Sequence, residues 1–141
     1  MLKKLTLNIM VKDVDKTVEF YKDILTCFEL VDSESSGEKL DWALVRCGNI
    51  QIMFESKESM ASSYPLLLGK DVGGSILIYI EMEGIKDLYK HIKDRVTIVK
   101  GLEDTSYGMK EFSILDCNGF LIVFAEWVGI REFFNKSVYN K

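Results

Sequence analysis

The sequence predicts an α+β fold in which one chain of 141 residues contains two βαβββ modules. Runs that alternate apolar and polar residues, as half-buried strands do, are interrupted twice by a run with helical spacing. The order of these runs repeats once along the chain with a fixed offset. A glycine-rich segment separates the two copies. We therefore expect two halves of the same build.

The first module begins with a strand around Leu5–Ile9, where apolar and polar residues alternate. Asp13 can cap the helix that follows. The apolar face of this helix is expected to consist of Val14, Val18, Tyr21 and Leu25. Three β-rich runs complete the module at residues 28–33, 40–47 and 50–55, and a tight Gly48-Asn49 turn joins the last two.

The second module repeats this order. We expect strands at residues 76–82, 96–100, 110–115 and 120–126, and a helix whose apolar face is Ile85, Leu88 and Ile92. Residues 48–55 (GNIQIMFE) resemble residues 119–126 (GFLIVFAE), 71 positions later. The two helix starts, Asp13 and Gly84, are also 71 positions apart. Two alignments with one offset indicate a duplication.

The segment between the modules carries the single proline, Pro65, together with three glycines, which is typical of a connector. We expect one domain over residues 1–126, with modules at 5–55 and 75–126, a connector at 56–74 and a tail at 127–141. Halves of about 70 residues are expected to share a core rather than to fold alone.

Composition excludes several function classes. Lys and Arg number 18 against 22 Asp and Glu, so the formal net charge of −4 argues against a nucleic-acid partner. No apolar stretch reaches the about 18–20 residues that span a bilayer, and polar residues interrupt the N-terminal run, so we expect no membrane partner and a cytoplasmic protein. Cys27, Cys47 and Cys117 are expected to be reduced thiols.

Two segments carry a family resemblance. Residues 11–25 (VKDVDKTVEFYKDIL) and 103–120 (EDTSYGMKEFSILDCNGF) are similar to the first-helix and second-half motifs of the vicinal oxygen chelate superfamily, which includes glyoxalase I, bleomycin-resistance proteins and extradiol dioxygenases. The resemblance covers roughly residues 3–127. It departs at Thr26-Cys27-Phe28 and at Cys117-Asn118, where the family has Gly-Phe and Pro-Asp. It implies that the sheets curl into a cup that holds the ligand.

Most enzymes of that family hold a metal ion through side chains that point into the cup. The resemblance places these positions on Thr6, Ile52, Leu77 and Val123, and only threonine among them has a polar side-chain atom. A register slip of one residue offers Gln51 alone. His91 is expected on the exposed side of the second helix. We therefore expect no metal, no other cofactor and a metal-free branch of the family.

The resemblance and strand alternation together predict which side chains line the cup. The predicted ligand-binding residues are Asn8, Trp42, Phe54, Tyr79, Glu81, Tyr107, Glu111 and Ser113. Apolar walls with few polar groups are typical of a site for an organic molecule. Each residue has a plainer interpretation. Trp42 and Tyr79 could equally fill a core, and Glu81 and Glu111 could be solvated or paired with a lysine such as Lys110.

The leading hypothesis is a metal-independent protein of the glyoxalase/bleomycin-resistance type that binds a small aromatic or cationic compound and so sequesters a drug or toxin. One alternative is a glyoxalase-like lyase or isomerase with an atypical site, in which Glu81 or Glu111 acts as general base. Another is a sensor module. The tail carries Phe133, Phe134 and Tyr139, which need a cover. The family resemblance implies a homodimer, and we expect the tail or the connector at residues 56–74 to contribute to it.

Overall fold

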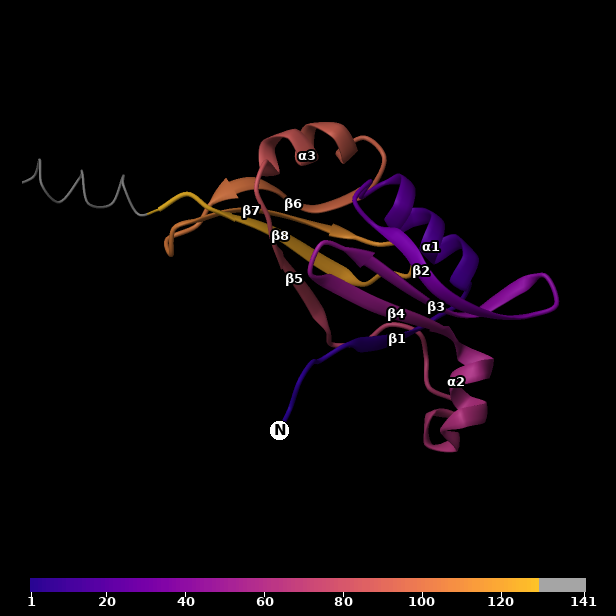
Figure 1. Cartoon of the computed structure of the whole chain (residues 1–141). Helices are drawn as coiled ribbons and strands as arrows, with labels where there is room; N and C mark the ends of the chain where they lie inside the picture. The colour runs from indigo at the N-terminus through magenta and orange to yellow at the C-terminus, as the bar shows by residue number, and fades with distance from the viewer. Residues whose placement is uncertain (130–141) are drawn as a thin grey trace, which may run out of the picture. The chain divides into compact units, whose positions relative to one another are not determined.

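The computed structural model describes residues 1–129, and these form two compact units. The first unit consists of residues 1–75 and 117–119, and the described part of the second consists of residues 76–116 and 120–129. Each unit contains one four-stranded mixed sheet and carries the predicted βαβββ order (Figure 1). The α+β prediction with two such modules is therefore confirmed.

The sheet of the first unit has the strand order β1-β4-β3-β2, in which β1 is parallel to β4 and the other neighbours are antiparallel. Its elements are β1 (Leu7–Val11), α1 (Val14–Asp23), β2 (Glu29–Ser36), β3 (Lys39–Cys47) and β4 (Ile50–Ser56), followed by α2 (Lys57–Ser63) and the short 3-10 helix η1 (Pro65–Leu67). The predicted connector thus contains a helix, which Ser56 caps by accepting a hydrogen bond from the Ser59 amide.

Helix α1 forms where its cap and its apolar face predict it. The Asp13 carboxylate accepts a hydrogen bond from the Lys16 amide at 2.9 Å, as an N-cap does. The four predicted face residues are all buried. Among them, Tyr21 lies 4.9 Å from Phe54 and 5.4 Å from Phe28, ring centre to ring centre, so the core of this unit lies between α1 and the sheet.

The second unit repeats the arrangement with the order β5-β8-β7-β6. Its elements are β5 (Leu77–Glu81), α3 (Ile85–Ile92), β6 (Thr97–Asp104), β7 (Met109–Leu115) and β8 (Leu121–Trp127). Helix α3 packs on β7 and β8 (Figure 1). Its residues Ile85 and Ile92 are fully buried, and the Phe112 ring lies between those of Tyr89 and Phe124, at 5.0 and 5.1 Å.

The side chains of β4 point to the opposite faces of the sheet from those predicted. Phe54 is fully buried beneath α1, and Ile52 is on the same helix-covered face, so both expected cup positions on this strand are wrong. The opposite face carries Gln51, Met53 and Glu55 instead. The reason is the turn before the strand. Cys47 pairs with Ile50 across two residues, whereas Leu115 pairs with Leu121 across five, so one offset cannot be carried through both turns.

The cysteines also differ from the prediction. Cys27 and Cys47 form a disulfide with a Cα–Cα distance of 5.3 Å, so the expectation of three reduced thiols is wrong for this pair. Cys117 lies outside this disulfide. The bond ties the turn after α1 to the end of β3.

Two further expectations concern membrane-spanning helices and the C-terminal tail. Across residues 1–129 no helix has the length and apolar character needed to cross a membrane. The tail residues Phe133, Phe134 and Tyr139, and with them the predicted contribution of the tail to a dimer, lie outside the described residues.

Candidate functional site

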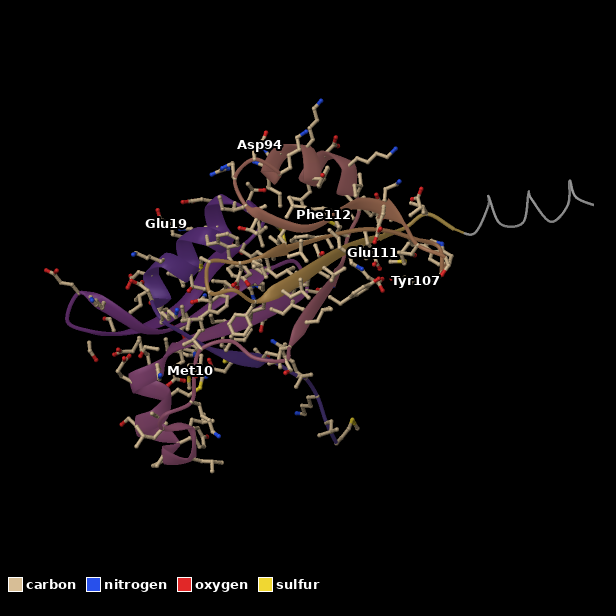
Figure 2. All side chains as sticks on the ribbon, turned by 180° about the vertical axis from the view of Figure 1, so that it is seen from behind. Met10, Glu19, Asp94, Tyr107, Glu111 and Phe112 are labelled. Atoms are coloured by element: carbon tan, nitrogen blue, oxygen red, sulfur yellow. A yellow bond between two sulfur atoms is a disulfide. The ribbon has the colours of Figure 1, made fainter. Side chains whose placement is uncertain are left out.

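The second sheet has one face covered by α3 and one face left open. Strand register places the open-face residues on three strands: Leu77, Tyr79 and Glu81 on β5, Glu111 and Ser113 on β7, and Leu121, Val123 and Ala125 on β8. The neighbouring side chains Glu111 and Phe112 lie on opposite faces of β7 (Figure 2). The predicted residues Tyr79, Glu81, Glu111 and Ser113 are therefore all on one face of this sheet.

A cleft of about 500 Å³ lies over this face. Its apolar wall consists of Leu77, Tyr79, Val99, Leu121 and Val123, and its polar groups include Lys100, Glu103, Tyr107, Glu111 and Ser113. The volume is that of a site for a small organic molecule, and mostly apolar walls with few polar groups are typical of such sites. Four of the eight predicted ligand-binding residues line this one cleft, namely Tyr79, Tyr107, Glu111 and Ser113.

The centre of the cleft is a carboxylate held by two phenols. The Tyr79 hydroxyl donates to Oε2 of Glu111 at 2.5 Å. The Tyr107 hydroxyl lies 2.8 Å from Oε1 and 2.9 Å from Oε2 of the same carboxylate. These are charge-assisted hydrogen bonds to a carboxylate, which are shorter and stronger than neutral ones. Glu111 is thus held in one orientation by tyrosines from β5 and from the loop before β7.

The carboxylate also changes how the two phenols titrate. The hydrogen bond to Glu111 raises the pKa of Tyr79 well above its ordinary value, and burial and the charge of Glu111 add to the rise. The same hydrogen bond raises the pKa of Tyr107. Both phenols therefore remain neutral hydrogen-bond donors at neutral pH, and the negative charge of Glu111 is oriented but not cancelled.

Tyr107 owes its position to a tight loop between β6 and β7. Thr105 closes the loop through its amide, which donates to the Met109 carbonyl at 2.7 Å. Gly108 follows with a φ of +88°, and a Cβ at this residue would lie 2.8 Å from Cζ3 of Trp127. A side chain is therefore excluded both by the backbone conformation and by the Trp127 ring.

Glu111 forms no salt bridge with a lysine or arginine within residues 1–129. Lys110 pairs with Asp104 at 2.8 Å rather than with Glu111. Ser113 is buried and accepts a hydrogen bond from the Lys100 amide at 3.1 Å, which ties β7 to the bulged strand β6. The cleft therefore presents a carboxylate that is positioned by neutral groups.

The other predicted residues lie elsewhere. Glu81 is on the open face but borders a separate hollow with Glu126 and Trp127. In the first unit, Asn8 Nδ2 donates to Glu55 Oε1 at 2.8 Å, and Trp42 pairs with Glu55 in register, so both are on the open face of their own sheet. Phe54 is on the covered face. Glu55 itself was missed, although the two-residue Gly48-Asn49 turn would have fixed its face.

The family model of the Glyoxalase/Bleomycin resistance protein/Dioxygenase superfamily matches residues 5–124. The chain belongs to this superfamily. A bleomycin resistance protein from Geobacillus stearothermophilus is 28% identical over 127 residues, which cover 84% of this chain and 92% of that protein.

Solved structures of other proteins share the fold. A glyoxalase/bleomycin resistance protein/dioxygenase family enzyme from Burkholderia phytofirmans PsJN has a TM-score of 0.71 at 18% identity, covering 86% of this chain and 96% of its own. TioX from Micromonospora sp. ML1 has a TM-score of 0.69 at 14% identity, covering 89% and 98%. At these identities the likeness establishes the fold alone.

The metal that many members of the superfamily carry does not fit the residues at the four positions where the resemblance places its ligands. Leu77 and Val123 offer no coordinating atom, and Thr6 offers only a hydroxyl. Gln51 is on the open face of β4, opposite to Ile52 and Phe54. However, Lys4 donates a hydrogen bond to the side-chain amide oxygen of Gln51. Within residues 1–129, no three His, Cys, Asp or Glu side chains are grouped so that they could hold an ion. These residues do not make a donor set for a first-row metal.

Proposed function

We propose that this chain is a metal-independent binding protein that takes a small aromatic or cationic compound into the cleft of the second unit. The observation that carries the proposal is the Glu111 carboxylate, which Tyr79 and Tyr107 hold within an apolar wall. An oriented negative charge attracts a cation, and the phenol rings beside it offer faces to an aromatic group.

The choice of binding over catalysis is supported by how Glu111 is engaged. A general base must direct a lone pair at the substrate proton, and each hydrogen bond that a carboxylate accepts uses one of its about four acceptor sites. Here both carboxylate oxygens already accept hydrogen bonds from phenols. This arrangement favours a fixed anion that recognises charge, and it disfavours the alternative of a glyoxalase-like lyase or isomerase with Glu111 as its base.

Metal independence is proposed from the donor chemistry. A Lewis acid that stabilises an enediolate needs several O or N ligands, and the expected positions carry hydrocarbon or a single engaged amide. The bleomycin resistance relatives support sequestration of an organic compound as the role, and we extend this role to the present chain as drug or toxin sequestration.

The test is a fluorescence titration with ethidium as an aromatic cation, anilinonaphthalene sulfonate as an aromatic anion, and bleomycin. We expect saturable binding of ethidium or bleomycin and preference for the cation over the anion. Replacing Glu111 by Gln removes the charge but keeps the shape. Because hydrogen bonds to charged groups contribute about 1.5–3 kcal/mol, E111Q is expected to weaken cation binding by roughly 10- to 100-fold.

The matched control is Asp94→Asn, which removes the same charge from an exposed residue beyond α3, on the helix-covered side of the sheet (Figure 2). This variant should bind ethidium as the wild type does. The proposal fails if neither ethidium nor bleomycin binds saturably, or if E111Q and D94N bind equally well.

A further inference from the structure

We infer that the cleft of the second unit selects a guanidinium or amidinium group carried on a small apolar body, and that this planar cation bridges the carboxylates of Glu103 and Glu111. The inference rests on the proposed function, because it names the class of cation that the same cleft takes. It adds Glu103 as the residue that determines this specificity.

The two carboxylates lie side by side on the open face of the sheet. Glu103 on β6 pairs in register with Glu111 on β7, and both residues line the cleft. Residues directly opposite each other on one face of an antiparallel pair have Cβ atoms about 4.5–5.5 Å apart. The hydrogen bond to Glu111 raises the pKa of Tyr107 most, and the charge of Glu103 adds to this rise, so both carboxylates act on the same phenol. One ligand group can therefore reach both of them.

No cationic side chain of the described chain neutralises this pair. Within residues 1–129, neither Glu103 nor Glu111 forms a salt bridge, and Lys110 pairs with Asp104 at 2.8 Å instead. Like charges directly opposite each other destabilise a strand pair, and a cation bound between them would remove the repulsion. Among the residues that line the cleft, Lys100 is the one lysine or arginine. Because Lys100 offsets one of the two negative charges, a single bound cation balances the other.

The remaining acceptor sites suit a planar cation. The Tyr79 and Tyr107 hydroxyls each donate one proton to Glu111, whose carboxylate has about four acceptor sites, so sites remain for a ligand. A guanidinium presents N–H donors along more than one edge, so one edge can meet Glu111 while another meets Glu103. It also stacks on aromatic rings and is less strongly hydrated than an ammonium. Tyr79 is 45% exposed and Tyr107 57%, which leaves their rings open to stacking.

The rest of the cleft suits the body that carries the cation. Its wall is apolar at Leu77, Leu121 and Val123, and its volume is about 500 Å³. Sites of this size take a small organic molecule. A free guanidinium ion would leave the apolar wall uncovered, so the ligand combines the planar cation with an aromatic or aliphatic body.

The test is a calorimetric titration of the full chain at neutral pH with phenylguanidine, benzylamine and benzamide. These compounds have similar bodies and carry a planar cation, a compact cation and no charge. We expect phenylguanidine to bind about 10-fold more tightly than benzylamine, and benzamide to bind most weakly. In E103Q the preference for phenylguanidine over benzylamine should fall to near equality, because only the planar cation uses both carboxylates. A general loss of negative charge would instead weaken both cations equally.

The matched control is E34Q, which removes a glutamate charge from an exposed position on β2 in the first unit and should keep the wild-type preference. Circular dichroism checks that both variants are folded. If E103Q does not fold, E103D replaces it, because a side chain shorter by one methylene should also lose the bridge.

The inference is overturned if phenylguanidine binds no more tightly than benzylamine, if E103Q keeps the preference, or if E34Q loses it as well. None of these outcomes prevents ethidium from binding in a way that depends on Glu111, so the proposed function is then left standing. Loss of all binding, that of ethidium and bleomycin included, would overturn both.

Discussion

At the scale of single residues, Tyr79 and Tyr107 both donate hydrogen bonds to the carboxylate of Glu111. Both phenols should therefore titrate at an unusually high pH. Because Glu111 raises the pKa of both phenols, tyrosinate should form at higher pH than the ordinary value of 10.0. E111Q should return both towards that value, which the ultraviolet absorbance of tyrosinate measures. The neutral phenols are favoured by folding, so their contribution to stability is complete below pH 10 and declines as pH rises towards the raised values.

The control for this titration is D94N, whose curve should follow the wild type. Superimposable curves for E111Q and wild type would contradict the hydrogen bonds from both phenols to Glu111. In the Y79F variant the Tyr79 phenol is absent. The decrease in the tyrosinate absorbance that forms at high pH therefore measures the contribution of Tyr79.

The sequence predicts the position of some site residues better than that of others. Tyr79, Glu111 and Ser113 are on the expected face of the sheet. Side chains alternate along a strand, so their faces follow once the strand itself is predicted correctly. Phe54 is on the other face because its assignment assumed that β4 and β8 follow equivalent turns, and these turns differ in length. The hydrogen bonds of Tyr107 could not be predicted, since they depend on the fold of the loop at residues 105–108.

At the scale of elements, a comparison of Gly108 with Gly119 distinguishes the energetic cost of backbone strain from the cost of a steric clash. Gly108 and Gly119 have similar φ angles, +88° and +83°, but only a Cβ at Gly108 would meet another residue, the Trp127 ring at 2.8 Å. Alanine at Gly119 should therefore lower the free energy of unfolding by about 1–2 kcal/mol from the left-handed conformation alone. Alanine at Gly108 should cost about 1–3 kcal/mol more, because the ring must move.

Denaturant unfolding of the two variants measures this difference. G108A should also weaken ethidium binding, since the loop that carries Tyr107 is displaced, whereas G119A should leave it unchanged. Equal losses of stability in the two variants would show that the Trp127 contact contributes nothing to the position of the loop.

At the scale of the whole molecule, the repeat was the most reliable predictor. The eight strands and the first helix of each module occur in the expected order because periodicity and capping are local properties. The offset of 71 relates Leu7 on β1 to Ile78 on β5, but it does not relate the strands that these residues pair with. Leu7 pairs with Ile52 on β4, whereas Ile78 pairs with Ile122 on β8, and these two partners are 70 positions apart. The disulfide could not be predicted, because pairing depends on which strands meet in space.

The donor chemistry of the chain makes a final prediction about the whole protein. A metal that binds the folded state raises the free energy of unfolding by about 2.7 kcal/mol at a concentration 100 times its Kd. For domains of this size each kcal/mol shifts the Tm by about 2–8 °C. Because Thr6, Gln51 and Leu77 do not form a ligand set, nickel, manganese and zinc should leave the Tm unchanged, whereas ethidium at saturating concentration should raise it. A saturable rise with any of these metals, or stoichiometric metal in protein purified without chelator, would mean that donors outside this set hold an ion, and catalysis would then become the better hypothesis.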